Sequence, residues 1–289
     1  MLLNIKSKYI LEEIFNNVKN NRKLKIIKYN KKILERLNIT KEDYEVYKLL
    51  KVFNEKYKIN IKGLDCEQIS INGMKIEKEE LELLSLLKNV KILYLYWNQM
   101  SDINIIAKFE NLIKLEICAN GISNIDILEN DNFRNLKVLD LGGNCISDIN
   151  VFEKVKFIEL EELYLDINEI SDINVLEKVN FKHLIILKLT NNNISNINVL
   201  EKVDFKILKE LYLGRNNIYD INVLEKVNFQ KLTILDLHNN KISNIDVLSK
   251  VNFEYLESLY LEDNLIKKYS RDDPLIKSLK SKLKNFLYK

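Results

Sequence analysis

The chain has 289 residues, of which 46% are hydrophobic and 30% charged, and its formal net charge is +3. This is the composition of a foldable globular protein, and the absence of any run of about 18 apolar residues excludes a predicted membrane-spanning helix. Residues 61–266 carry 22 basic and 33 acidic residues, so the largest surface is acidic, which argues against nucleic acid and favours a protein partner of basic character.

Residues 1–60 are predicted to form a helical N-terminal domain, in which 15 basic residues outnumber 7 acidic ones. Thr40 and Asp43 have the spacing of a helix start. The apolar side of the helix that follows consists of Val46, Leu50, Phe53 and Tyr57. Earlier apolar residues indicate an amphipathic helix over 10–18 and one or two further helices over 24–37.

Between residues 61 and 266 the sequence repeats itself. Asparagines recur at one interval of 22 residues and then at six intervals of 24, and the apolar residues around them follow the pattern LxxLxLxxNxIxxIxxLxxVxF. A fixed period of this length predicts stacked supersecondary units that form a solenoid. The repeated asparagines are Asn98, Asn120, Asn144, Asn168, Asn192, Asn216, Asn240 and Asn264.

This pattern resembles the leucine-rich repeat, whose hallmark is LxxLxLxxNxL, over residues 66–266. The resemblance implies an α/β solenoid with a curved parallel sheet on its concave side and short helical turns on its convex side. It also implies that the asparagines form a ladder between the backbones of neighbouring turns. The LxL alternation itself predicts a short strand with its leucines pointing inward.

Two more features of the repeat concern its convex side. Asn174 and Glu177 have the spacing of a capping box, as do the equivalent residues of other units, which predicts a short helical turn. A column of phenylalanines is predicted to stack beneath that turn. These are Phe133, Phe157, Phe181, Phe205, Phe229 and Phe253.

Both ends of the solenoid are predicted to carry caps, because a repeat buries its faces only against neighbours. Residues 66–76 hold a worn copy of the repeat, in which Met74 stands 24 residues before Asn98. Asp273 and Pro274 predict the start of a C-terminal capping helix within 267–289. The apolar face predicted for that helix is Leu275, Leu279, Leu283 and Phe286.

The sequence does not favour catalysis. His183 and His238 are far apart, and no phosphate-binding, zinc-protease or serine-nucleophile motif occurs. Cys66, Cys118 and Cys145 lack metal-type spacing, and an odd number of cysteines without a disulfide framework indicates a reducing compartment. The N-terminal stretch MLLNIKSKYILEEIF is too interrupted by charge for a signal peptide. We therefore expect a non-enzymatic protein without cofactor, metal or membrane attachment, in the cytoplasm or alternatively the nucleus.

Variation is concentrated at the outward positions four, two and one place before each repeated asparagine. Tyrosines, the single tryptophan and acidic residues gather there, and tyrosine, tryptophan and arginine dominate interface energetics. The alternative is that the aromatic residues only pack laterally, as good strand formers do. The candidate partner-binding residues are Tyr94, Tyr96, Trp97, Asp140, Tyr164, Asp166, Tyr212, Arg215, Asp236, His238 and Tyr260.

The leading functional hypothesis is a scaffold that binds a protein partner on the concave face. The short unit NxIxxIxxL is similar to that of the leucine-rich regulatory subunit of protein phosphatase 1 and to that of bacterial internalins. The first similarity implies a phosphatase-regulatory subunit as an alternative, and the second implies secretion and wall anchoring, for which the sequence shows no signal. Units of 24 residues, rather than 22, depart from both classes.

A second alternative is a substrate receptor of a ubiquitin ligase. The segment YILEEIFNNVKNNRKLKIIKYNKKI is similar to an F-box, although the Leu-Pro that usually opens an F-box is absent and Lys31 or Ile33 stands near the expected tryptophan. The residues that would meet a Skp-type adaptor are Ile10, Leu11, Ile14, Phe15, Val18 and Leu24. The same helices could instead only cap the solenoid.

A third alternative is nucleic-acid contact through the basic ends of the chain. Residues 1–60 contain aromatic residues among their lysines, at Tyr29, Tyr44 and Tyr47. Scattered lysines are more often a means of solubility, and binding of this kind would weaken steeply with ionic strength.

Overall fold

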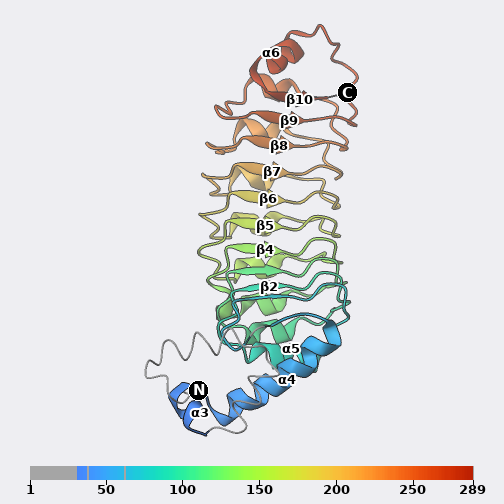
Figure 1. Ribbon diagram of the computed structural model, residues 1–289. Helices are drawn as coiled ribbons and strands as arrows, with labels where there is room; N and C mark the ends of the chain where they lie inside the picture. The colour runs from blue at the N-terminus through green and yellow to red at the C-terminus, as the bar shows by residue number, and fades with distance from the viewer. Residues whose placement is uncertain (1–30, 38, 62, 289) are drawn as a thin grey trace.

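A computed structural model describes residues 31–37, 39–61 and 63–288 of the chain. Within them, ten parallel strands form one open sheet whose order follows the chain, with helices at both ends (Figure 1). The strands are β1 (Gln68–Ser70), β2 (Ile92–Tyr94), β3 (Lys114–Glu116), β4 (Val138–Asp140), β5 (Glu162–Tyr164), β6 (Ile186–Lys188), β7 (Glu210–Tyr212), β8 (Ile234–Asp236), β9 (Ser258–Tyr260) and β10 (Asn285–Leu287).

The helical elements lie at the ends of the coil and on the return path of each repeat. The α-helices are α3 (Lys31–Leu37), α4 (Lys41–Tyr57), α5 (Lys78–Ser85) and α6 (Pro274–Lys282). The 3-10 turns are η2 (Asn104–Lys108), η3 (Asp126–Glu129), η4 (Asp131–Phe133), η5 (Asn150–Glu153), η6 (Asn174–Glu177), η7 (Asn198–Glu201), η8 (Asn222–Glu225) and η9 (Asp246–Ser249). None of the described helices is both long and apolar enough to cross a bilayer.

Each repeat strand coincides with the LxL alternation. In β5 the central Leu163 is fully buried, whereas Glu162 and Tyr164 on either side are half-buried. Equivalent residues pair across the sheet, so that Leu163 faces Leu187 in β6 and Leu187 faces Leu211 in β7. The predicted inward leucines are confirmed, and they fix the register, because a slip of one residue would turn the whole leucine row outward.

The repeated asparagines connect successive coils through buried hydrogen bonds. The side-chain oxygen of Asn192 accepts from the backbone N–H of Ile170 in the preceding coil, at 3.0 Å. Its amide nitrogen donates to the carbonyl of Leu165 in that coil, at 2.9 Å, and to the carbonyl of Leu189 in its own, at 3.1 Å. Asn192 thereby satisfies backbone groups that the bend after the strand leaves unpaired.

The residue before each of these asparagines has a left-handed backbone. Its φ is 55° at Trp97, 55° at Ile167 and 65° at Gly143, for example. The full column is Trp97, Ala119, Gly143, Ile167, Asn191, Arg215, Asn239 and Asp263. This conformation costs roughly 1–2 kcal/mol for a residue with a Cβ and is least suited to bulky or β-branched side chains. Trp97 and Ile167 are therefore strained, and both are exposed, at 70% and 58%.

The return path of each repeat is a 3-10 turn, and the predicted capping box there is wrong. Asn174 is the first residue inside η6 and its side chain caps nothing. Instead, Asp172 Oδ1 accepts from the backbone N–H of Asn174 at 2.8 Å. The same two-residue step is made by Asn124, Asp148, Asn196, Asp220 and Asn244. A short polar residue that binds the backbone two places on forms such a turn without needing a glutamate.

A row of exposed ion pairs joins successive 3-10 turns. Lys178 Nζ lies 2.9 Å from Glu153 Oε2, and Lys202 Nζ lies 2.8 Å from Glu177 Oε2. Equivalent pairs follow at Lys154–Glu129, Lys226–Glu201 and Lys250–Glu225. Because all of these side chains are largely exposed, each pair adds little to stability.

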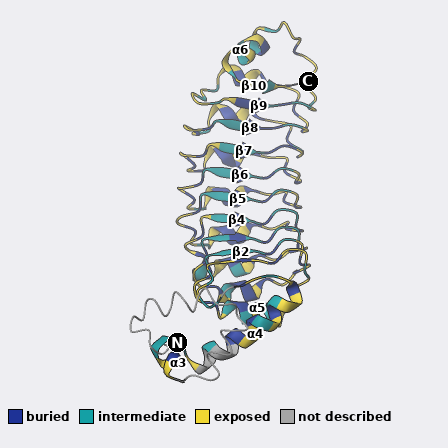
Figure 2. Ribbon diagram, viewed as in Figure 1, coloured by how far each residue is buried: buried dark blue, intermediate teal, exposed yellow. Residues whose placement is uncertain are grey.

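The predicted phenylalanine column lies inside the coil, where dark blue marks the buried residues in Figure 2. Phe157 and Phe181 stack with ring centroids 6.2 Å apart and an interplanar angle of 19°, and Phe152 meets Phe181 edge-on at 5.9 Å. The first five members of the column are buried, whereas the last, Phe253, is half-buried.

The N-terminal end of the coil is covered by α4 and α5. Thr40 and Asp43 form the predicted capping box of α4, and the apolar side of that helix, including Leu50 and Phe53, belongs to the core of the solenoid. α5, which the sequence pattern did not reveal, follows β1 and contacts α4. The two helices are tied together at Glu80, which binds both Lys56 and Tyr57 of α4.

At the C-terminal end α6 begins as predicted, with Asp273 Oδ1 accepting from the backbone N–H of Leu275 at 2.8 Å. The predicted apolar face is wrong beyond Leu279. Leu283 follows the last residue of the helix and has an extended backbone, and Phe286 lies in β10, which pairs with β9. The unpaired edge of β9 thus receives a tenth strand, whose residues lie 27 positions after their partners in β9 rather than 24, as Asn285 pairs with Ser258.

Candidate functional site

The outward side chains of β2–β9 and of the residues just after these strands form one surface, here called the sheet face. They occupy three columns, six, four and two residues before each ladder asparagine. The first column is Ile92, Lys114, Val138, Glu162, Ile186, Glu210, Ile234 and Ser258. The second is Tyr94, Glu116, Asp140, Tyr164, Lys188, Tyr212, Asp236 and Tyr260. The third is Tyr96, Cys118, Gly142, Asp166, Thr190, Gly214, His238 and Glu262.

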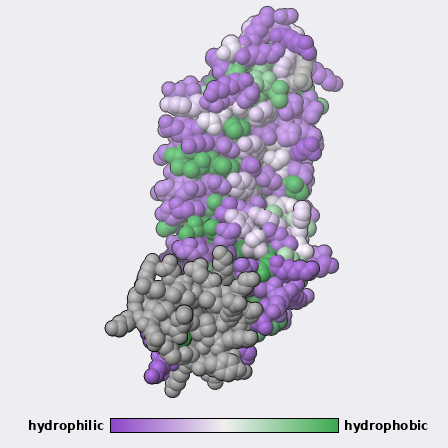
Figure 3. Space-filling model, viewed as in Figure 1, coloured by the Kyte–Doolittle hydropathy of each residue, from purple (hydrophilic) through white to green (hydrophobic). Residues whose placement is uncertain are grey.

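The sheet face is acidic. Its three columns hold seven carboxylates and two lysines, whereas the chain as a whole carries a net charge of +3. The strand-side columns are mostly half-buried, and hydrophobic residues on the visible surface form separate spots rather than one continuous patch (Figure 3). Polar and charged groups therefore determine what this surface can bind.

The centre of the sheet face is a lysine held between two tyrosines. Lys188 Nζ lies 5.1 Å from the ring centroid of Tyr164 and 4.8 Å from that of Tyr212. Each tyrosine hydroxyl donates to a glutamate two residues earlier, Tyr164 to Glu162 at 2.7 Å and Tyr212 to Glu210 at 2.9 Å. Burial, and then these hydrogen bonds, raise the pKa of both tyrosines above the ordinary value.

Carboxylates crowd the next part of the surface, on β3 to β5. Burial, and then the charges of Asp140 and Glu162, raise the pKa of Glu116 to about 7, although Lys114 Nζ lies 2.6 Å from Glu116 Oε1. Burial also raises the pKa of Asp140 and that of Asp166. The carboxyl groups in this part of the surface therefore resist ionisation. A cation placed among them would favour their ionised form and would in turn be held by their negative charge.

Aromatic residues gather at the N-terminal end of the sheet face. The rings of Tyr94 and Tyr96 lie 5.9 Å apart, and Lys114 Nζ lies 5.6 Å from the centroid of Tyr94. Trp97 follows directly, but in the left-handed column at the margin of the sheet rather than in the three columns of the face. Arg215 lies in the same marginal column.

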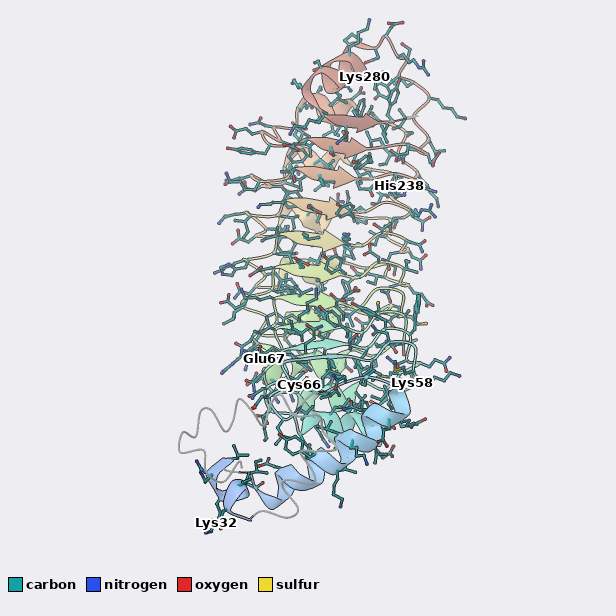
Figure 4. All side chains as sticks on the ribbon, viewed as in Figure 1. Lys32, Lys58, Cys66, Glu67, His238 and Lys280 are labelled. Carbon is teal, nitrogen blue, oxygen red and sulfur yellow. The ribbon has the colours of Figure 1, made fainter. Side chains whose placement is uncertain are left out.

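Towards the C-terminal end, His238 lies at the carboxyl end of β8 (Figure 4). Its Nδ1 is 2.7 Å from Asp236 Oδ1, which also accepts from the His238 backbone N–H at 3.0 Å. A Cβ on Gly214 would lie 2.2 Å from the His238 ring, so only glycine leaves room for the histidine there. Tyr260 pairs with Asp236 across β8 and β9.

The structure thus brings nine of the eleven candidate partner-binding residues onto one surface, and it places Trp97 and Arg215 at its margin. Lys188 was recognised from sequence as an outward residue but not as a candidate, and Glu162 and Glu210 were not singled out; these three residues complete the central arrangement. A signal was present, because ELYL occurs at 162–165 and again at 210–213, one repeat before and one repeat after Lys188.

No group of three or more potential metal ligands occurs among the described residues. Burial, and then the charges of Asp140 and Glu116, raise the pKa of the Cys118 thiol to about 12, which disfavours the reactive thiolate. Burial likewise raises the pKa of Cys66. These features suit a binding surface better than a nucleophilic or metal-dependent site.

A pocket of about 790 Å³ lies beneath α6, away from the sheet face. Its walls include Phe253, Leu256, Leu275 and Leu279. The pocket arises where α6 replaces the regular return path of a further repeat, which also explains why Phe253 is half-buried.

The residues predicted to meet a Skp-type adaptor, Ile10 to Leu24, lie outside the described residues. In the described part of that N-terminal region, α4 contributes Val46, Leu50, Phe53 and Tyr57 to the core of the solenoid.

The comparisons with known proteins agree with this architecture. A family model described as Leucine Rich repeats (2 copies) matches residues 208–250, and no curated protein sequence matches the chain. Internalin C2 of Listeria monocytogenes has a similar structure, with a TM-score of 0.58 and 21% identity over 73% of this chain and 92% of its own.

Two further solved structures are similar over smaller shares of their own length. The functional domain of InlJ from Listeria monocytogenes, which includes a cysteine ladder, has a TM-score of 0.53 and 18% identity over 77% of this chain and 48% of its own. The PEPR1–AtPEP1 structure has a TM-score of 0.53 and 19% identity over 71% of this chain and 29% of its own. This chain therefore spans less than half of either. Ten strands in equivalent register, asparagines that bridge successive coils, and the match to the repeat model identify the chain as a leucine-rich repeat protein.

Proposed function

We propose that this protein is a non-enzymatic scaffold that binds another protein through the sheet face. The observation that carries the proposal is the contrast between the two sides of each strand. The inward positions are leucine in repeat after repeat, whereas the outward positions change from tyrosine to carboxylate, lysine, glycine or histidine. A constant interior supports the coil, and a varied exterior supplies specific contacts.

The tyrosines of the sheet face support the same proposal. Tyr164 and Tyr212 are held in place by hydrogen bonds to Glu162 and Glu210 and by the charge of Lys188 between them. Rings that are already fixed lose little conformational entropy when a partner covers them, which favours binding. One of the similar folds, PEPR1–AtPEP1, is itself a complex, and it adds to this proposal by analogy of fold.

The test is capture of a partner from the native cell with the full chain as bait, followed by binding measurements on that partner. Tyr164, Tyr212 and Tyr260 are changed together to Ala, and the expected result is at least a hundredfold loss of affinity, about 3 kcal/mol. A matched control changes the exposed tyrosines Tyr219 and Tyr255, which lie outside the sheet face. Unchanged affinity of the triple variant, or equal loss in the control, would show that the sheet face is not the binding surface.

Two of the three alternatives from sequence are kept as further proposals, although no contact among the described residues favours either. The ligase-receptor hypothesis predicts that the full chain retains a Skp-type adaptor and that changing Ile14 and Phe15 to Ala releases it. The phosphatase-regulatory hypothesis predicts retention of a phosphatase catalytic subunit in the same capture experiment. A cytoplasmic location belongs to the same set of proposals and is tested by fractionation of the native cell.

A further inference from the structure

The charge of the sheet face is not balanced by the described residues of the chain. Both of its lysines are already engaged, Lys114 by Glu116 and the Tyr94 ring, and Lys188 by two tyrosine rings. The charges of Lys114 and Lys188 act on Asp140, and that of Lys188 acts on Asp166, but among the described residues neither aspartate forms an ion pair. They accept backbone N–H groups instead, Asp140 from Gly142 and Asp166 from Thr190, each at 2.9 Å.

These two aspartates lie on either side of one tyrosine. Asp140 pairs with Tyr164 across β4 and β5, and Asp166 follows Tyr164 by two residues and so points to the same face. On its other side, Tyr164 pairs with Lys188, whose ammonium group lies 5.1 Å from the ring centroid. The tyrosine thus has a cation on the β6 side, Asp140 on the β4 side and Asp166 two residues further along its own coil.

The position between the aspartates carries no side chain. A Cβ on Gly142 would lie 3.2 Å from Asp140 Oδ1 and 3.4 Å from the carbonyl oxygen of Asp166. The neighbouring residue of the same column, Cys118, is also small. A ligand group can therefore approach the two carboxylates without displacing a bulky side chain of this column.

Resting on the proposed function above, we infer that the partner presents a cationic extended segment, one of whose lysine or arginine side chains binds beside Tyr164 between Asp140 and Asp166. The chain already shows how this surface holds such a group, because Lys188 is bound by the same tyrosine on its other side. A cation over an aromatic ring and next to a carboxylate gains from both contacts. The strands of the sheet face lie about 4.8 Å apart, so an extended segment of about ten residues would cross all eight.

The experiment measures the binding of two labelled peptides of about ten residues to the full chain by fluorescence anisotropy. One alternates lysine with serine, and the other alternates glutamate with serine. The lysine peptide is expected to bind at least about tenfold more tightly, and this preference is expected to fade as salt is raised from about 20 mM to about 500 mM. Equal binding of the two peptides, or no binding of the lysine peptide, overturns the inference.

The site is tested by changing Asp140 and Asp166 together to Asn, which keeps their size and their acceptor oxygen. This variant is expected to lose at least about tenfold in affinity for the lysine peptide, because two charge-assisted contacts are removed. A matched control changes the exposed Glu110 and Glu159 to Gln, which removes the same charge outside the sheet face and is expected to change affinity by less than about twofold. Equal loss in the control would mean unspecific charge attraction and would overturn the site.

Failure of this inference is distinguishable from failure of the proposed function. A native partner that is lost when Tyr164, Tyr212 and Tyr260 become Ala, but that binds the Asp140→Asn, Asp166→Asn variant with full affinity, leaves the sheet face as the binding surface and refutes the cationic segment. Preferential binding of a single-stranded oligonucleotide over the lysine peptide would also refute it. Circular dichroism of each variant confirms that the solenoid is intact.

Discussion

The sharpest test of the architecture is removal of one interior asparagine of the ladder, by Asn192→Ala. This asparagine is 7% exposed. Its loss leaves the backbone N–H of Ile170 without the acceptor that lies 3.0 Å away, and the carbonyls of Leu165 and Leu189 lose donors at 2.9 and 3.1 Å. An unsatisfied buried donor costs about 1–3 kcal/mol, and the small cavity adds to it, so we expect a loss of about 2–4 kcal/mol in the free energy of unfolding.

The chain offers a matched control at the end of the same ladder. Asn264 makes the equivalent bonds, accepting from Ile242 N–H at 3.0 Å and donating to the carbonyl of Leu237 at 2.8 Å, but its bonds are only partly buried. Water can replace them, so Asn264→Ala is expected to cost about 1 kcal/mol or less.

Urea unfolding followed by far-ultraviolet circular dichroism measures both variants. Because a repeat array is stabilised by contacts between neighbours, breaking an interior contact is also expected to lower the slope of the transition, as the two halves begin to unfold separately. If Asn192→Ala costs no more than Asn264→Ala, the amides do not hold the coils together and the reasoning is refuted.

Other predictions use the same unfolding assay. Ile167→Gly is expected to stabilise the protein by about 0.5–1 kcal/mol, because glycine relieves the strain of the left-handed backbone. Ile158 is also exposed but is not among the positive-φ residues, so Ile158→Gly is expected to destabilise the protein. Stabilisation by both substitutions would refute the strain argument. The pKa of Glu116, raised from 4.5 to about 7 chiefly by burial, means that the folded protein retains a proton that the unfolded chain releases, so stability falls as pH rises through this window. The free energy of unfolding of Glu116→Gln should match that of the wild type near pH 4.5 and exceed it above pH 7, by about 1 kcal/mol after solvent screening. If the stability of this variant falls with pH as that of the wild type does, the raised pKa of Glu116 is contradicted. Glu177→Gln breaks the exposed pair with Lys202 and is expected to leave the free energy of unfolding unchanged. A marked drop would show that the ion-pair row acts as a cooperative network.

The repeating part of the fold was predictable because one residue period specifies three things together: the strand, its register and the asparagine after it. Outside the repeat, the starts of α4 and α6 follow from their capping residues, but the path of the chain after α6 does not. Phe286 continues an apolar helical spacing after Leu279, yet it lies in β10, because the open edge of β9 is satisfied better by another strand than by a longer helix. The capping box at Asn174 failed for a local reason, since Asp172 forms the turn two residues earlier.

The candidate surface was predictable as a set of positions but not as a set of contacts. The columns follow from the repeat, whereas the place of Lys188 between Tyr164 and Tyr212 depends on which side chains meet across strands. The left-handed column was within reach of sequence reasoning, because Gly143, Asn191 and Asn239 in it are residue types that tolerate positive φ. Trp97 and Ile167 in the same column obscured that signal.

The near identity of residues 163–181 and 211–229 has a consequence for how such a protein can change its length. Since every rung presents the same register to the next, an unequal recombination event that gains or loses one 24-residue unit would join equivalent atoms on both sides of the junction and leave the terminal caps untouched. The reach of the molecule could therefore grow or shrink in steps of about 4.8 Å without any redesign of its interior.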